Sequence, residues 1–477
     1  MEGQNYPYDS QLWYDMNSTL DPSTLTLGSG YWRRQLASFM GRVNYNLMDK
    51  YLLTASLRYD GSSIFYVENQ WDYFPSFSLA WKIDNENFMQ NVDIISQLKL
   101  RAGYGTVGQS GVAPYETAGR LQESYYVFGE DPAKGFAPEL IQTREVGWEK
   151  TTTTNLGIDF GLFRNRVSGS IDLYRANTHD LLLDKTIPAI TGYDHVRANV
   201  GKTRNEGIEI ALYTYNVDRG DFRWETDFTF TRNREQILEL AEGAEDDISN
   251  GWFIGQPINS YYTYEYDGIW KEEDQELIDF YNETGNNGFA PGKIRVKDVD
   301  GNDTINTNDR TVVGHNVPRF SGGITNRLYY KGFQFSFFVF FRVGHGIYSR
   351  DGHYFPMTAR YATPFLVDYY LPMGTPEENA DAVHPAPSNL RDRYESAMWY
   401  REASFLKLRH VTLSYDVPGS FLSRINVKSL RLSVQAFNPL LITDYPFLDP
   451  EAQSSDTNRT PPGTSGQGWT FSVRVGF

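Results

Sequence analysis

The stretch Phe39–Tyr59, FMGRVNYNLMDKYLLTASLRY, decides the fold. Apolar and polar residues alternate along both of its halves, and a polar turn at Met48-Asp49-Lys50 separates the halves. A period of two indicates extended strands, and two such runs across a short polar turn predict an antiparallel hairpin. Each run has about 10 residues and would span ~33 Å, which is long for a soluble sheet but suits a tilted strand that crosses a ~30 Å hydrocarbon layer.

The composition of the whole chain agrees with strands that face lipid on every second residue. The 477 residues have a mean hydropathy of −0.50 and an aromatic content of 15%. No window of 18 consecutive apolar residues occurs, so no transmembrane helix is predicted. A β-barrel keeps its average hydropathy low because only alternate residues meet lipid, and aromatic girdles at the two membrane interfaces account for the many Tyr and Trp residues.

Several classes of function are disfavoured by the composition. A net charge of −16 argues against a nucleic-acid partner, which would require a basic face. The absence of cysteine removes disulfides, thiolate metal sites and cysteine nucleophiles. The seven histidines show no metal-binding spacing, and Gly103–Gly108 matches a nucleotide-binding glycine pattern but is followed by residues that cannot continue as a helix. We therefore predict that the protein is not an enzyme.

The rest of the chain repeats the long hairpin, and alternating segments predict thirteen strands. Short turns join members of a pair, such as 162–167 and 331–332, whereas long connections separate the pairs. Short periplasmic turns and long extracellular loops are the layout of an outer-membrane barrel. The last residues also alternate and end on an aromatic residue, Phe477, as the terminal strands of such barrels do. The predicted fold is an all-β, antiparallel transmembrane β-barrel.

We expect one face of the first hairpin to meet lipid through Phe39, Val43, Leu47, Leu53 and Leu57, and the other to line the lumen through Arg42, Asn44, Ser56 and Arg58.

Several segments resemble the SusC/RagA-like family of TonB-dependent outer-membrane transporters. They include KYLLTASLRYDGSSIF, WEKTTTTNLGIDFGLFRNRVSGSIDLY, NVGKTRNEGIEIAL and FLKLRHVTLSYDVP, at 50–65, 148–174, 199–212 and 405–418. The resemblance implies a barrel of ~22 strands around a plug, so the thirteen strands are expected to form its C-terminal part. Residues 1–34 are then an extracellular loop segment, and 35–477 are barrel with extracellular inserts at about 109–144, 235–317, 345–399 and 439–468.

The same resemblance implies a location and a set of partners. We expect the outer membrane of a Gram-negative bacterium, a SusD/RagB-like surface lipoprotein over the loops, and contact with TonB through the N-terminal part that this sequence lacks. The remaining barrel strands and plug of the transporter, outer-membrane lipid, and an oligosaccharide or peptide cargo complete the list. Two alternatives stay open: a passive pore or structural barrel without TonB coupling, and a secreted soluble glycan-binding β protein.

One acidic segment, 298–309, carries a candidate metal site. Oxygen-bearing side chains stand at positions 1, 3, 5, 7, 9 and 12 of a twelve-residue run, which is the spacing of an EF-hand calcium loop. They are Asp298, Asp300, Asn302, Thr304, Asn306 and Asp309. Position 6 is Asp303 where such loops have glycine, and position 12 is aspartate where they have glutamate. An Asn- and Asp-rich solvent turn is the alternative. No cofactor other than Ca²⁺ is predicted.

Aromatic residues of the long inserts are the predicted cargo contacts, because flat rings stack on sugars and pack against peptide side chains. They are Tyr125, Tyr126, Trp252, Tyr261, Tyr262, Tyr264 and Trp270. For any one of these rings, the alternative is a role in a girdle or in the packing of a loop.

Overall fold

The computed structural model describes residues 32–128, 131–193, 195–240, 245–285, 288–348, 368–387, 392–422, 427–445, 449–451 and 466–477. The expected loop at 1–34 therefore lies outside the described residues except for its last three. Among the described residues, no helix is both long enough and apolar enough to cross a membrane.

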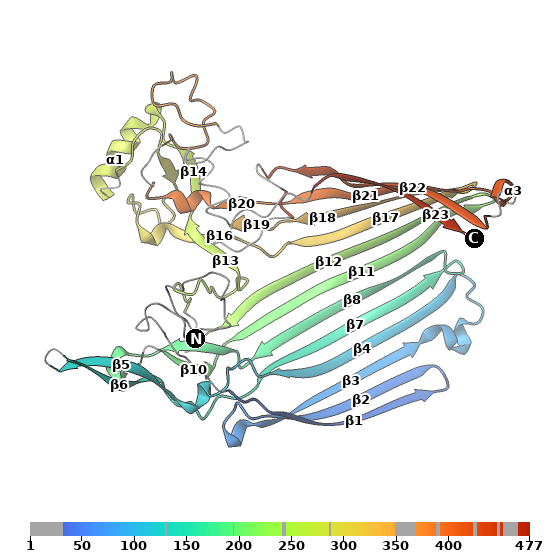
Figure 1. Ribbon diagram of the computed structural model, residues 1–477, viewed down its shortest axis with the longest axis horizontal. Helices are drawn as coiled ribbons and strands as arrows, with labels where there is room; N and C mark the ends of the chain where they lie inside the picture. Colours follow the sequence, from blue (N-terminus) through green and yellow to red (C-terminus); the bar gives the residue numbers. More distant parts are fainter. Residues whose placement is uncertain are drawn as a thin grey trace, which may run out of the picture.

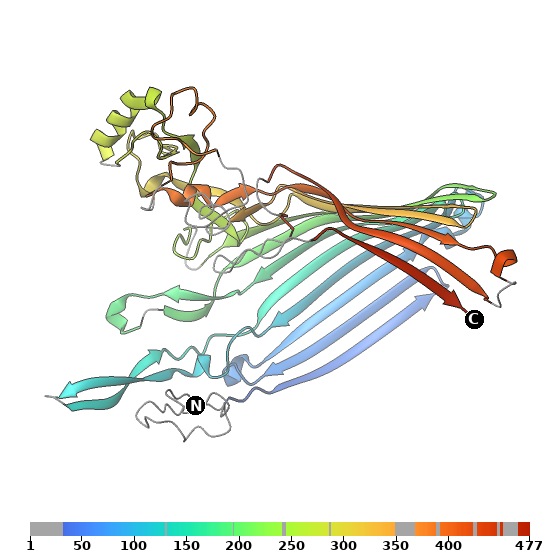
Figure 2. The same ribbon diagram turned by 45° about the horizontal axis from the view of Figure 1, so that its top comes forward.

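One antiparallel sheet of thirteen strands dominates the structure, and its strands follow one another in chain order (Figure 1). The strands are β1 (Leu36–Leu47), β2 (Tyr51–Ser62), β3 (Trp71–Lys82), β4 (Ile95–Gln109), β7 (Glu149–Leu162), β8 (Val167–His179), β11 (Lys202–Arg219), β12 (Phe222–Glu239), β17 (Phe320–Tyr330), β18 (Phe333–Val343), β21 (Phe405–Asp416), β22 (Ser429–Thr443) and β23 (Gly468–Gly476). The sheet curves into an open trough (Figure 2). The prediction of an all-β antiparallel fold with thirteen long strands is confirmed.

The connections sort by length between the two ends of the sheet. Tight turns, together with the one-turn helix α3 (Gly419–Leu422), lie at one end, where the chain also finishes at Phe477 (Figure 1). All the long connections lie at the other end, which is the extracellular end in an outer-membrane barrel.

The register places apolar side chains on one face of the sheet, here called the lipid face. In the first hairpin Val43 pairs with Ala55 and Tyr45 with Leu53, and Leu53 in turn pairs with Leu79 of β3. Many apolar side chains of this face are exposed, among them Leu57 at 48% and Leu79 at 44%. Such exposure fits a surface that meets lipid tails and not water.

The opposite face, here called the lumen face, is polar and held by ion pairs between strands. On β4, Arg101 lies 2.8 Å from Asp159 of β7 and 2.9 Å from Asp172 of β8. Arg327 of β17 pairs in the same way with Asp227 of β12, at 2.5 Å. Arg101 reaches Asp159 on the neighbouring strand and Asp172 on the strand beyond it, and Arg327 reaches Asp227 on the neighbouring strand, so these contacts fix the register as well as the polarity of the face.

A β-bulge at Arg409 changes the phase of β21. The register with β18 shifts between Phe338 and Val339, where Arg409 has no opposite residue on β18. Without the extra residue, Lys407 would lie on the same face as Val411 and Leu413. The bulge turns Lys407 to the lumen face instead.

Short strands and one helix build the extracellular loops. The paired strands are β5 (Arg120–Phe128) with β6 (Asp131–Leu140), β9 (Leu182–Thr186) with β10 (His195–Asn199), β13 (Ser260–Tyr264) with β16 (Arg310–His315), β14 (Tyr266–Ile269) with β15 (Ile294–Val296), and β19 (Gly346–Tyr348) with β20 (Tyr400–Glu402). The helical part is a short 3-10 turn (Glu272–Asp274) followed by α1 (Gln275–Gly285), whose Ile278 is buried.

Two loops that are distant in sequence share one hydrophobic core. The described residues of 260–315 and 368–402 are here called the loop module. Its core joins Trp270, Ile278 and Ile294 from the first segment to Tyr394 and Met398 from the second. These side chains are at most 1% exposed, so the module is packed like a small domain and is not a loose loop.

Candidate functional site

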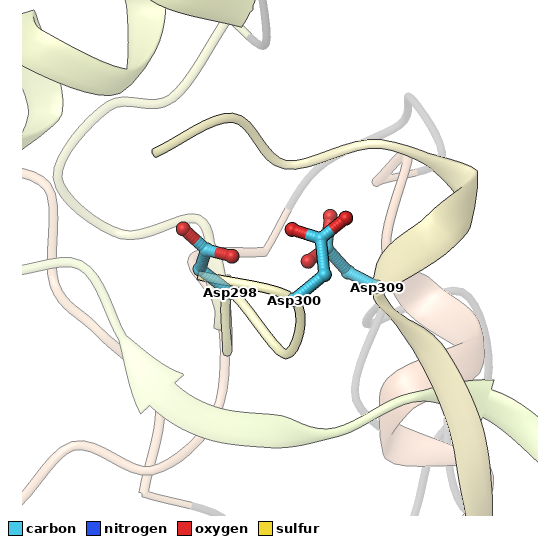
Figure 3. A group of neighbouring side chains, drawn as sticks. All are labelled: Asp298, Asp300 and Asp309. Carbon is cyan, nitrogen blue, oxygen red and sulfur yellow. The ribbon is translucent and has the colours of Figure 1, made fainter. Parts of the chain in front are cut away.

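The acidic segment 298–309 lies in the loop module, between β15 and β16. Carboxylate oxygens of Asp298, Asp300 and Asp309 all lie within 4.8 Å of one another. Figure 3 shows the three carboxylates gathered on one side of the loop. The structure thus brings together positions 1, 3 and 12 of the predicted calcium loop.

Local backbone geometry explains how the chain turns there without a glycine at position 6. Asp303 adopts a φ of +61°, and Gly301 a φ of +69°. Aspartate tolerates this left-handed conformation better than most residues. Ile305 at position 8 is 1% exposed and packs into the core of the loop module, which fixes the acidic loop to the module.

Backbone N–H groups orient the carboxylates. Asp298 accepts hydrogen bonds from the N–H groups of Gly301 at 2.7 Å and of Asp303 at 2.8 Å. Asp309, which is fully buried, accepts from Val299 at 2.9 Å and Asn306 at 2.7 Å. Desolvation raises the pKa of the Asp298 carboxyl, but the backbone hydrogen bonds outweigh it and leave the pKa below its ordinary value.

Charge in the acidic loop is left uncompensated by the protein. Within the described part of the chain, none of Asp298, Asp300 and Asp309 forms an ion pair with a cationic side chain. Three carboxylates so close together repel one another, and a bound cation would relieve that repulsion. Oxygen ligands on a preformed loop suit Ca²⁺.

The remaining predicted ligands serve the turn itself in this structure. Asn302 donates to the Asp300 carboxylate at 2.9 Å and accepts from the N–H of Thr304 at 2.9 Å. Asn306 accepts from the N–H of Asn308 at 2.8 Å and donates to the carbonyl of Thr304 at 3.2 Å. Asp309 is also one methylene shorter than the glutamate that usually closes such a loop.

Two of the predicted cargo contacts are core residues, which corrects the expectation for them. Trp270 is 1% exposed and Tyr264 is 5% exposed, and both belong to the core of the loop module. Tyr264 packs edge-on against Tyr394, and the Arg310 guanidinium lies 5.2 Å from its ring centre. Both rings therefore pack the core of the loop module.

Three other predicted contacts keep part of their surface accessible. Tyr261 stacks on Tyr348 with ring centres 5.0 Å apart, and burial raises its pKa to about 12. Tyr262 packs against Phe253 at 4.7 Å, and the backbone of Trp252 closes a small bridge with Asp247. All three rings are half-buried at the extracellular end of the sheet.

Three of the positions named from the sequence remain: Tyr125, Tyr126 and Phe477. Tyr125 and Tyr126 belong to β5, but their side chains lie outside the described part of the structure. Phe477 follows β23 and is 82% exposed.

Sequence reasoning missed the residues that assemble around Tyr261. The Tyr400 ring fits against two glycines, and a Cβ added at Gly346 would lie 1.9 Å from it. Arg342, on the lumen face of β18, donates to the carbonyl of Asn316 at 3.3 Å. Burial lowers the pKa of the neighbouring His345 to about 4, and the Arg342 charge adds to the effect. Their positions 261, 342, 345 and 400 give no local pattern that could have linked them.

A second missed cluster lies inside the trough, on the lumen face. Lys407 is 2% exposed, and its Nζ lies 2.5 Å from Asp449 and 2.9 Å from Glu451. Arg409 pairs with the same Glu451. These contacts hold the segment 449–451 of the last long connection against the sheet wall, so a buried lysine is matched by two carboxylates.

A curved antiparallel wall with an apolar outer face and a polar inner face defines the class of outer-membrane β-barrels. A family model described as "TonB dependent receptor-like, beta-barrel" matches residues 2–438. The chain belongs to this family, which is one of outer-membrane receptors and transporters, and the resemblance to SusC/RagA-like proteins is confirmed.

Relatives of known name support the same assignment. The chain is 32% identical over 446 residues to TonB-dependent receptor P3 of Formosa agariphila, which covers 90% of this chain and 43% of that protein. It is 31% identical over 453 residues to TonB-dependent receptor SusC of Bacteroides thetaiotaomicron, again covering 90% of this chain and 43% of the relative. A solved structure of the RagAB peptide transporter matches with a TM-score of 0.75 and 25% identity, over 96% of this chain and 49% of that chain. The chain thus spans less than half the length of the relatives it matches.

Proposed function

We propose that the chain is part of a TonB-dependent importer that takes up oligosaccharides or peptides through the outer membrane. The observation that carries the proposal is the similarity of nearly the whole chain to SusC and to the RagAB peptide transporter. In this role the chain supplies wall and extracellular loops. Its work is binding and passage, with no covalent chemistry.

The edges of the sheet support a larger assembly. Within the described residues, β1 and β23 each have a neighbouring strand on one side only. An unpaired strand edge exposes a row of N–H and C=O groups, which lipid cannot satisfy. We propose that further strands of the same transporter pair with these edges and that a plug fills the trough.

Features of the extracellular loops support a surface partner. The loop module is a packed body at the extracellular end of the wall, and half-buried aromatic rings such as Tyr261 lie beside it. A SusD/RagB-like lipoprotein resting on the loops would complete a closed cargo chamber, and TonB would drive opening from the periplasm.

Uptake by intact cells tests the importer proposal. Fluorescent oligopeptide and oligosaccharide pools are supplied to cells with and without the protein, in the presence and absence of a proton-gradient uncoupler. We expect uptake of one pool that requires both the protein and the gradient. Uptake that needs the protein but persists with the uncoupler would instead establish a passive pore, and uptake of neither pool would refute import of these cargoes.

We also propose that the acidic loop 298–309 binds Ca²⁺ and stiffens the loop module. The support is the approach of three uncompensated carboxylates within 4.8 Å on a loop anchored by Ile305. Titration calorimetry of the purified protein with CaCl₂ is the test, with Asp309→Asn as the disrupting variant. Asp303→Asn is the matched control, because it removes a charge at a position that such loops do not use as a ligand and keeps a residue tolerant of positive φ. Binding that is absent in the wild type, or equal in the two variants, would overturn the proposal.

A further inference from the structure

A group of arginines lies on the lipid face where the apolar surface ends. Along β12 this face carries Phe222, Trp224, Phe228 and Phe230 and then changes to Arg232 and Arg234. The ten steps along the strand from Phe222 to Arg232 rise ~25 Å if the strand is tilted by ~40°, which is about the height of the apolar band of an outer-membrane barrel. The two arginines therefore lie at the level of the lipid headgroups of the outer leaflet.

The neighbouring strands change from apolar to basic at nearly the same height. On β11, Ile208 pairs with Arg232 and Glu206 with Arg234. On β8, Leu173 pairs with Ile208 and Arg175 with Glu206. Because β8, β11 and β12 are adjacent in the wall (Figure 1), these residues form one surface, here called the arginine patch: Arg175, Arg204, Arg232 and Arg234.

The arginine patch keeps a surplus of positive charge. Glu206, which lies among these arginines on β11, is 3.0 Å from Arg175. Arg204 donates a hydrogen bond to the side chain of Asn177 at 2.9 Å. Arg232 and Arg234 are exposed and have no hydrogen-bond or ion-pair partner in the described part of the chain. This surplus occurs on a chain whose net charge is −16, so it is not a consequence of a basic composition.

Grooves flank the two unpaired arginines on both sides. One groove, of about 680 Å³, runs toward β8 and β7, and its apolar lining includes Leu156, Leu173 and Ile208. The other, of about 550 Å³, runs toward β17 and has a mixed lining, in which Phe230, Pro318 and Phe320 lie beside polar residues such as Glu235 and Arg319. A ligand with an anionic head and apolar chains would place its charge on Arg232 and Arg234 and its chains along the groove toward β8 and β7.

The alternative is that these arginines simply extend to the interface, as basic side chains do on many membrane proteins. The four strands β2, β3, β4 and β7 do not repeat the pattern toward the extracellular end. Their lipid face carries Tyr59 on β2, Tyr73 on β3, Tyr104 on β4 and Thr154 on β7. The basic residues are confined to one sector of the wall, which favours a localised binding site over a general girdle.

We propose that the arginine patch binds a phosphorylated glycolipid of the outer leaflet, with the phosphate held by Arg232 and Arg234 and the acyl chains in the groove toward β8 and β7. Guanidinium groups match phosphate in charge and in bidentate geometry, and the apolar walls would accept acyl chains. The inference depends on the position of the wall in the membrane and not on the identity of the cargo.

The test measures binding of purified lipid A to the detergent-solubilised protein by native mass spectrometry. The variant is Arg232→Gln/Arg234→Gln, and the matched control is Arg58→Gln/Arg223→Gln, which removes two lumen-face arginines. Loss of one charge-assisted hydrogen bond weakens binding on the order of tenfold. We expect the patch variant to bind at least about tenfold more weakly than the wild type, and the control to bind as the wild type does.

Two further measurements distinguish the source of the phosphate and guard against misfolding. Enzymatically dephosphorylated lipid A should bind at least about tenfold more weakly, and millimolar inorganic phosphate should not displace lipid A. Unchanged circular dichroism and heat-dependent gel mobility should show that both variants are folded. Equal binding by patch variant and wild type, equal binding of dephosphorylated lipid, or displacement by free phosphate would each overturn the proposal.

Discussion

The assignment of the two faces of β2 leads to a quantitative prediction for adjacent leucines. Leu53 lies on the lipid face beside Tyr45 and Leu79, whereas Leu52 lies on the lumen face beside Asn46 and Ala80. Replacing each by arginine introduces the same charge at nearly the same depth. The difference between the two variants therefore reports only the face.

The expected loss of stability depends on the depth of Leu53 in the membrane, and aromatic residues that mark the two interfaces give that depth. On this face, Tyr51 stacks on Trp81 near the tight turns, and Tyr59 stacks on Tyr73 toward the extracellular end. The two tyrosines are eight positions apart, which places the midpoint at Ala55. Leu53 therefore lies only ~5 Å below it after allowing for tilt. Arginine on the lipid face costs ~2–4 kcal/mol at the midplane and ~0–1 kcal/mol at the interfaces.

We expect Leu53→Arg to lower the free energy of unfolding by about 2 kcal/mol and Leu52→Arg by less than about 1 kcal/mol. On the same reasoning, arginine at the lumen-face Ser56 is tolerated. The assay is urea unfolding of the protein in lipid vesicles, followed by tryptophan fluorescence. A cost for Leu52→Arg equal to or larger than that for Leu53→Arg would refute the assignment of the faces.

The remaining predictions concern the loops. Trp270→Ala should lower the free energy of unfolding of the loop module by about 3–5 kcal/mol and make residues 260–315 sensitive to limited proteolysis. Leu277→Ala, at an exposed position, should leave the digestion pattern unchanged. Equal digestion of the two variants would contradict the assignment of Trp270 to the core. His345 has a folded pKa of about 4 against an ordinary 6.5, so its stabilising effect is complete above pH 6.5 and is lost as the pH falls toward 4. His345→Leu should therefore make the melting temperature fall less steeply between pH 6.5 and pH 4. A melting temperature that falls as steeply in the variant as in the wild type would contradict this role of His345. Because the pKa of Asp298 is lowered from 3.8, Ca²⁺ affinity should hold from pH 7 to 5 and fall only below pH 4; a tenfold weakening by pH 5 in calorimetry would disagree.

Local pattern in the sequence determined the architecture of the wall. A strand in a membrane barrel must alternate lipid and lumen residues, and the constraint acts on every second residue along its length. The hairpin from Phe39 to Tyr59 could therefore be predicted with its turn and its faces, and the same period located all thirteen strands of the sheet. The approach of Asp298, Asp300 and Asp309 could also be predicted, because the three residues are close in sequence.

Packing between distant segments was decided only by the tertiary structure. The sequence could not separate a ring for cargo from a ring for the core, and Trp270 is buried because residues more than a hundred positions away, such as Tyr394, close over it. Lys407 faces the lumen because one extra residue in β21 changes the phase, and it meets Asp449 across a long connection. Arg232 and Arg234 share a face by spacing alone, but only the register with β8 and β11 places them next to Arg175 above an apolar groove. Such contacts depend on which distant segments and strands meet, and the local period of two carries no information about that.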